Sequence, residues 1–123
     1  MANLELPYRL AVGAIACNRD GLVLVGERLD SPGAWQFPQG GMDEGETPLA
    51  AAQREFQEEV GVTLTEPIAE YPDWLYYDFP PEVQARAAIG KAYRGQKQRW
   101  FLFGWPEGTS YCLATHTPAR PQV

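Results

Sequence analysis

Three glutamates within one short stretch are the residues of this sequence best placed to do chemistry. Glu55, Glu58 and Glu59 fall on an arc of about 100° if the segment is helical. Like charges three and four positions apart cost a helix roughly 0.2–0.5 kcal/mol each, and the last turn is also the negative end of the helix dipole. A divalent cation would offset this cost, and carboxylates without His or Cys suit Mg²⁺ or Mn²⁺. The alternative is a solvated acidic helix face, the usual role of a charge run.

One helix positions these carboxylates. Thr47 is a good N-cap, Pro48 suits the first helical position, and Gly61 suits the position after the last turn. The sequence therefore predicts a helix over residues 49–60. Its core-facing stripe is predicted to contain Leu49, Ala52, Phe56 and Val60.

The spacing of residues 40–62 resembles the Nudix box. Fixed positions of that box are filled by Gly40, Glu46, Arg54, Glu55, Phe56, Glu58, Glu59, Gly61 and Val62. The resemblance to the Nudix hydrolases implies a loop–helix–loop that holds Mg²⁺ (or Mn²⁺) and hydrolysis of a diphosphate linked to another moiety. It implies that Glu55, Glu58 and Glu59 are metal ligands. It also implies catalytic roles for Glu46, which would orient a metal-bound water or the loop, for Arg54, which would orient carboxylates, and for Glu58.

Segments outside the box resemble one branch of the family, the bacterial RNA pyrophosphohydrolases, which are close kin of the dinucleoside polyphosphate hydrolases. These segments are residues 35–46, 73–80 and 93–103, together with Tyr8 and Arg9, and the resemblance covers residues 7–105. It implies release of pyrophosphate from 5′-triphosphorylated RNA ends, or asymmetric cleavage of dinucleoside polyphosphates. Two alternatives stay open: a housecleaning hydrolase of free nucleoside triphosphates, and a truncated nucleotide-binding module with little activity. A sugar nucleotide substrate also stays open, although FPQGG and GQKQ argue against it by resemblance.

Hydrolysis of a phosphoanhydride requires neutralised charge on several phosphoryl oxygens, so cationic and hydrogen-bonding side chains are candidate substrate contacts. Arginine and lysine would contact phosphate, a glutamine phosphate or base, a tyrosine could stack on a purine, and glycines would permit a tight turn and close approach. The candidates are Arg9, Arg28, Gln39, Gly40, Gly41, Tyr77 and Lys97. The alternatives are surface charges for Arg28 and Lys97 and a core or edge aromatic for Tyr77. Trp35, Trp74 and Trp100 are predicted to be packing residues, and His116 no catalyst.

The elements around the helix predict an α+β fold with a mixed sheet. Strands are expected at residues 8–16 and 22–27, forming a hairpin, and at 35–38, 63–71, 73–79 and 99–105. Residues 80–90 read as a loop with a helical turn, and residues 91–98 as a basic cluster. The family resemblance implies a Nudix-type α/β/α sandwich.

The whole chain of 123 residues is long enough for a single domain, residues 1–123. Its net charge of −6 argues against DNA coating and against an anionic membrane surface. No apolar run of membrane-spanning length and no signal-peptide core occur, and Cys17 and Cys112 lack metal-ligand spacing. We therefore expect thiols in a reducing compartment, a cytoplasmic location, and a nucleotide or RNA 5′ end as the partner.

The tail, residues 106–123, departs from the family pattern. The relatives continue with a strand, a loop carrying an acidic residue, and a C-terminal helix that covers the sheet. Here Pro118 and Pro121 disfavour a terminal helix, and Glu107 is the tail's sole carboxylate. We expect the C-terminal helix, and a metal ligand outside the box, to be missing. An uncovered sheet face would then favour self-association.

Overall fold

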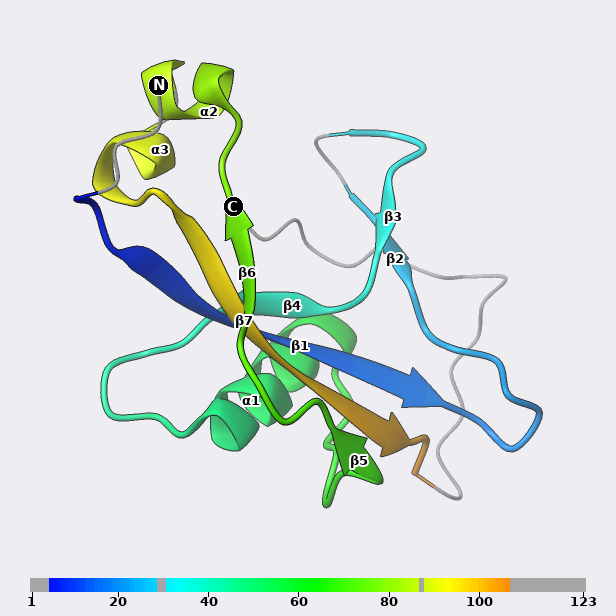
Figure 1. Cartoon of the computed structure of the whole chain (residues 1–123). Coiled ribbons are helices and arrows are strands. Elements are labelled where there is room, and N and C mark those ends of the chain that lie inside the picture. Colours follow the sequence, from blue (N-terminus) through cyan, green and yellow to red (C-terminus); the bar gives the residue numbers. More distant parts are fainter. Residues whose placement is uncertain (1–4, 29–30, 87, 107–123) are drawn as a thin grey trace.

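A five-stranded mixed sheet forms the centre of the computed structural model, which describes residues 5–28, 31–86 and 88–106 (Figure 1). The strand order is β4 (Gln39–Gly41), β1 (Tyr8–Cys17), β7 (Gly95–Gly104), β5 (Ala69–Glu70), and β6 (Leu75–Asp78) also pairs with β7. β1 and β7 run parallel from the Tyr8–Gly95 pair to the Cys17–Gly104 pair, whereas the other pairings in this sheet are antiparallel. The α+β class and the mixed sheet are confirmed.

Helix α1 (Pro48–Val60) covers one face of the sheet (Figure 1). Its caps are those predicted: the Thr47 side chain accepts a hydrogen bond from the Ala50 amide at 3.2 Å, and Gly61 has a left-handed φ of 82°. The predicted stripe also faces the core, with Phe56 fully buried and Leu49 and Val60 packed at its margin. The buried core joins α1, β1 and β7 and contains Val12, Ala14, Ala16, Ala51, Ala52, Phe56, Leu64, Phe101 and Phe103.

Two further helices lie at the end of the sheet where β6 stops and β7 begins (Figure 1). They are α2 (Pro81–Arg86) and α3 (Ala88–Ala92), and they pack chiefly against each other. Residues 80–90, predicted to be a loop with a helical turn, are thus more helical than expected, because Pro81 begins a helix whose first turn needs no proline N–H. The expected loss of the C-terminal helix concerns residues outside the described ranges. His116 and Glu107 also lie outside them.

The predicted hairpin between residues 8–16 and 22–27 forms only beside its turn. The turn forms as expected, since Gly21 has φ 80° and Asn18 Oδ1 accepts the amides of Asp20 and Leu22 at 3.0 Å. Beyond it, an isolated bridge from Val23 to Cys17 joins the two segments. Strand β4 occupies the same edge of β1, so β2 (Gly26–Glu27) pairs instead with β3 (Trp35–Gln36) in a separate two-stranded sheet.

Other strand boundaries also differ from the predictions. Of the strand expected at residues 63–71, only β5 (Ala69–Glu70) forms. Residues 35–38 do not form one strand, because β3 ends at Gln36 and the chain resumes as β4 at Gln39. β7 begins at Gly95 rather than at Arg99, so half of the basic cluster is a sheet strand. Trp35, predicted to pack, is 55% exposed.

The described residues contain no helix that is both long and apolar enough to cross a membrane. The Cys17 thiol is free and contacts the Phe103 carbonyl oxygen at 3.5 Å. Cys112 lies outside the described residues.

Candidate active site

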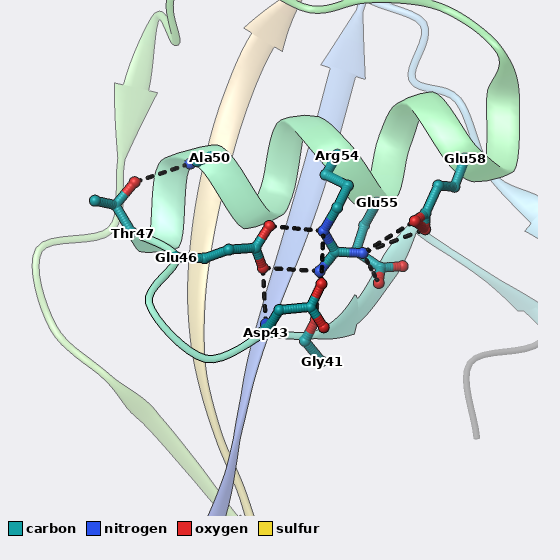
Figure 2. A network of polar contacts seen from close by, with 8 residues as sticks. All are labelled: Gly41, Asp43, Glu46, Thr47, Ala50, Arg54, Glu55 and Glu58. Atoms are coloured by element: carbon teal, nitrogen blue, oxygen red, sulfur yellow. Dashed lines mark hydrogen bonds and ion pairs between the residues drawn. The ribbon is translucent and has the colours of Figure 1, made fainter.

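Arg54 stands at the centre of the carboxylates on α1 and in the preceding loop (Figure 2). Its Nε donates to Glu46 Oε2 at 2.7 Å and its Nη2 to Glu46 Oε1 at 2.9 Å, which makes a bidentate ion pair. Nη2 also donates to the Gly41 carbonyl at 2.9 Å, and Nη1 donates to Glu55 at 3.0 Å and Glu58 at 3.1 Å. One guanidinium therefore fixes the strand end, the loop and the helix relative to one another.

The carboxylate of Glu46 is held by hydrogen bonds from Arg54 and from the loop. Besides the two Arg54 contacts, its Oε1 accepts the Asp43 backbone amide at 2.7 Å. The hydrogen bonds from Arg54, helped by the Asp43 amide, hold the pKa of Glu46 below its ordinary value. The hydrogen bonds that Arg54 donates to Glu46, Glu55 and Glu58 raise the pKa of Arg54 above its ordinary value. This arrangement favours the loop-orienting role among those implied for Glu46.

Glu55 lies in a different environment. It is 8% exposed, and its burial raises the pKa of the carboxyl above its ordinary value against the opposing effect of Arg54. The carboxyl group lies directly over Gly40, where a Cβ atom would come within 2.2 Å of the Glu55 carboxyl carbon. The absence of a side chain at position 40 thus leaves room for the Glu55 carboxyl against β4. It does not serve a tight turn, because Gly40 and Gly41 are strand residues without positive φ.

The three predicted metal ligands differ in their surroundings. Glu55 and Glu58 meet at Arg54 Nη1, whereas both carboxylate oxygens of Glu59 are buried. In the part of the chain that the structure describes, no three His, Cys, Asp or Glu side chains form a group able to hold a metal ion. The donor set itself is oxygen-only and suits a hard cation.

A polar cleft of about 220 Å³ lies on the sheet face opposite α1. It collects five of the seven predicted substrate contacts, one or two from each of four segments: Arg9, Arg28, Gln39, Gly40 and Tyr77. The register explains this, because Arg9 and Tyr77 both pair with Gln96, and paired residues point to one face. Sequence reasoning missed Gln96 and Gln98, which also line the cleft. The two glutamines at alternate positions of the segment GQKQ (residues 95–98) were the sequence signal that could have identified them.

Arg9 connects this cleft to a second cavity of about 590 Å³ beside the loop, lined also by Gly41, Glu46 and Glu55. Its guanidinium lies across Gly41, where a Cβ atom would be 2.5 Å from Nη2. Gly41 thus lies beside Arg9 and close to the other predicted substrate contacts. The structure does not bring Lys97 to them: its Nζ lies over the Trp74 ring, 4.9 Å from the centroid. Neighbouring strand residues face opposite sides, so Lys97 points away from Gln96 and Gln98.

The mixed sheet, the capped helix and the carboxylates around one arginine are the architecture that the sequence resemblance implied. The NUDIX domain family model matches residues 7–119, and the chain belongs to this family.

The similar proteins point to one branch. An RNA pyrophosphohydrolase of Cereibacter sphaeroides (strain KD131 / KCTC 12085) is 54% identical over 103 residues, covering 81% of this chain and 63% of that protein. An RNA pyrophosphohydrolase of Acidiphilium cryptum (strain JF-5) is 52% identical over 121 residues, covering 95% of this chain and 72% of that protein. The branch resemblance is confirmed, and the chain spans less than two thirds of the length of the first of these relatives.

Solved structures share the fold. The E. coli dihydroneopterin triphosphate pyrophosphohydrolase superposes with a TM-score of 0.64 at 26% identity, over 85% of this chain and 74% of that one. A C. elegans Ap4A hydrolase superposes with a TM-score of 0.56 at 22% identity, over 85% and 75% of the two chains, and shows the fold alone.

Proposed function

We propose that this protein is a Mg²⁺-dependent pyrophosphohydrolase that acts on 5′-triphosphorylated RNA ends, on dinucleoside polyphosphates, or on both. The observation that carries the proposal is the junction at Arg9, where a cleft of hydrogen-bond donors meets the Arg54-centred carboxylates. Binding of an anionic phosphate chain needs the donors of the cleft, and hydrolysis of a phosphoanhydride needs the carboxylates. The RNA pyrophosphohydrolase names of the similar proteins support the substrate class.

The residues of the chain divide the work. Arg9 and Arg28 would neutralise phosphoryl oxygens, and Gln39 would donate to phosphate or base. Tyr77 is half exposed at the cleft and would stack on a purine, a contact worth roughly 1–3 kcal/mol. Gly40 and Gly41 permit Glu55 and Arg9 to lie against the strand backbone.

The metal would be held by Glu55, Glu58 and Glu59, with Glu46 and Arg54 keeping the loop and the carboxylates in place. Bound Mg²⁺ supplies charge neutralisation and a more acidic water. The buried carboxyl of Glu55 supports this assignment, because a cation would compensate the charge that burial disfavours. Lys97 stays a weaker candidate for phosphate, since its ammonium group faces Trp74. The substrate class also fits a cytoplasmic place of action, as cysteine usage suggests.

Product analysis with Mg²⁺ tests the proposal. Triphosphorylated RNA, diadenosine tetraphosphate and free nucleoside triphosphates are compared at equal concentration. We expect pyrophosphate from the RNA or ATP from the dinucleotide. Turnover of free triphosphates alone would instead favour the housecleaning alternative, which the likeness to a dihydroneopterin triphosphate pyrophosphohydrolase supports. Nucleotide binding by a folded protein without any turnover would favour the binding module and contradict the proposal.

A further inference from the structure

A chain of three side chains on β7 links the polar cleft to an apolar groove on the same sheet face. Gln96, Gln98 and Trp100 occupy alternate positions of the strand. The Trp100 indole Nε1 donates to Gln98 Oε1 at 3.1 Å, and Gln98 Nε2 donates to Gln96 Oε1 at 3.3 Å. Gln96 and Gln98 line the cleft, and Trp100 lines the groove.

The chemistry of the indole fixes the direction of this chain. An indole N–H can only donate, so the Gln98 atom that meets it is the carbonyl oxygen. The Gln98 amide nitrogen is then turned toward Gln96, and because that nitrogen can only donate, it meets the Gln96 carbonyl oxygen. The amide nitrogen of Gln96 is left as the free end of the chain. One donor at Trp100 therefore orients two amides that could otherwise turn either way.

The Trp100 ring is itself held by packing. It lies flat against Gly13 of β1, where a Cβ atom would be 2.3 Å from ring atom Cζ3. The Phe37 ring packs against it in a T-shaped arrangement, with a centroid distance of 6.1 Å and an interplanar angle of 77°. The indole N–H thus points along the strand from a ring whose position the sheet fixes.

We propose that Trp100 is a positioning residue for the polar cleft, acting through Gln98 and Gln96. With both amide carbonyls engaged, the glutamines turn N–H groups to the cleft. The guanidinium groups of Arg9 and Arg28 can also only donate. The cleft is therefore lined by donors and suits a ligand rich in anionic acceptor oxygens, such as a phosphate chain. The proposal rests on the proposed function for its ligand class and adds a residue outside the cleft that sets its polarity.

The variant Trp100→Phe tests this, because phenylalanine keeps a ring over Gly13 and loses the N–H. The probe is inorganic tripolyphosphate, titrated by calorimetry in metal-free buffer so that no hydrolysis takes place. We expect binding about tenfold weaker than in the wild type, as for the loss of one good hydrogen bond to a charged group. Trp74→Phe is the matched control: Trp74 faces Lys97 and Arg99 on the other side of β7, and its replacement should leave tripolyphosphate affinity unchanged.

A double-mutant cycle separates positioning from simple packing. If Trp100 acts through the amides, Trp100→Phe should have little further effect on affinity in a Gln98→Leu background, because Gln98 is the residue that Trp100 contacts. The side-chain amide NMR signals of Gln96 and Gln98 should shift in Trp100→Phe and stay in place in Trp74→Phe. Should Trp100→Phe fail to fold, Gln98→Leu breaks the chain at its middle and is expected to weaken binding equally.

Unchanged tripolyphosphate affinity in Trp100→Phe, or additive effects of the Trp100 and Gln98 substitutions, would overturn the proposal. A wild type that does not bind tripolyphosphate would overturn the ligand class. These outcomes differ from a failure of the proposed function, which the product analysis decides by turnover.

Discussion

Arg54 decides how the acidic residues of this site share their charge. Glu46 receives two hydrogen bonds from the guanidinium, and its pKa is lowered, whereas buried Glu55 receives one, and its pKa is raised. Glu58 contacts the same nitrogen as Glu55 but is solvent exposed. Residues of one type thus have different electrostatic roles, which the spacing of the sequence could not distinguish.

We expect Glu58→Gln to lower the hydrolysis rate by roughly 10²–10⁴-fold, the range for a catalytic group, while the fold is retained. The amide can still accept from Arg54, and the bidentate contact to Glu46 is untouched. Initial rates and the unfolding temperature with and without Mg²⁺ check this, and Mg²⁺ should raise that temperature less in the variant. Exposed Glu66→Gln is the control. A variant as active as the wild type would remove Glu58 from the site.

At the scale of the elements, predictions succeeded where the determinants are local. Thr47, Pro48 and Gly61 specify the ends of α1 within a few residues, so its bounds followed from the sequence. The start of β7 was missed because Gln96 and Gln98 line a cleft and give the strand a polar pattern in place of an apolar one. The partner of β2 was missed because pairing depends on which distant strand already occupies the edge of β1.

For the site, the Nudix box predicted the residues around Arg54, and the resemblance to one branch of the family pointed to most residues of the cleft. Lys97 lies apart from the other candidate contacts, because a strand turns successive side chains to opposite faces, and the sequence predicted this strand to begin at Arg99 and not at Gly95. The contact of Trp100 with Gln98 was not predictable, because it depends on a ring packed over Gly13 of another strand.

The contact between α1 and β4 should be intolerant of even one methyl group. Gly40→Ala places a Cβ within 2.2 Å of the Glu55 carboxyl, so we expect the free energy of unfolding to fall by about 1–3 kcal/mol, as in overpacked cores. Urea unfolding measures this. Gly104→Ala is the matched control, since its Cβ would meet Ile68 at an ordinary 3.5 Å. Equal stability of the two variants would show that the Glu55 carboxyl can move away from position 40 without cost.

A polar cluster joins the beginnings of β1 and β7 to the end of β6. Tyr8 donates to Asp78 at 2.5 Å and Arg94 donates to it at 2.9 Å, which lowers the pKa of Asp78. The hydrogen bond to Asp78 in turn raises the pKa of Tyr8. The contribution of Asp78 is present above its unfolded pKa of about 3.9 and is lost as pH falls through the lower folded value. That of Tyr8 is present below about 10 and is lost as pH rises through the raised value.

Asp78→Asn should therefore destabilise the protein most between about pH 5 and 9, and the difference from the wild type should shrink toward both extremes. Urea unfolding across the pH range tests this, with exposed Asp73→Asn as the control. A difference that does not vary with pH would show that the cluster acts by packing and not through ionisation.

At the scale of the whole molecule, the face of the sheet opposite α1 carries an open apolar groove of about 530 Å³. Its lining includes Ile15, Phe37, Tyr71, Leu75, Trp100 and Leu102. Leu75 is 40% exposed and Tyr71 48% exposed, and contiguous apolar surface of this kind favours association. Within the described residues, this groove is the surface to which the predicted self-association through an uncovered sheet face would apply.

We expect the protein to self-associate through this groove as its concentration rises, and Leu75→Glu to shift it toward monomer. Sedimentation equilibrium measures this over a concentration series. Leu22→Glu places the same charge at an exposed leucine outside the groove and should leave association unchanged. A wild type that stays monomeric throughout would remove the groove as a contact between copies.

The parallel ladder between β1 and β7 has a consequence for how the chain comes to be folded. β1 begins at Tyr8, and its long partner is the last described strand, so the centre of the sheet closes a loop that contains nearly every other element. Contacts of such sequence separation slow folding and leave strand edges open meanwhile. During synthesis, β1 therefore has to wait for β7 to leave the ribosome, and a chain interrupted before Gly104 would present an unpaired edge to chaperones and proteases.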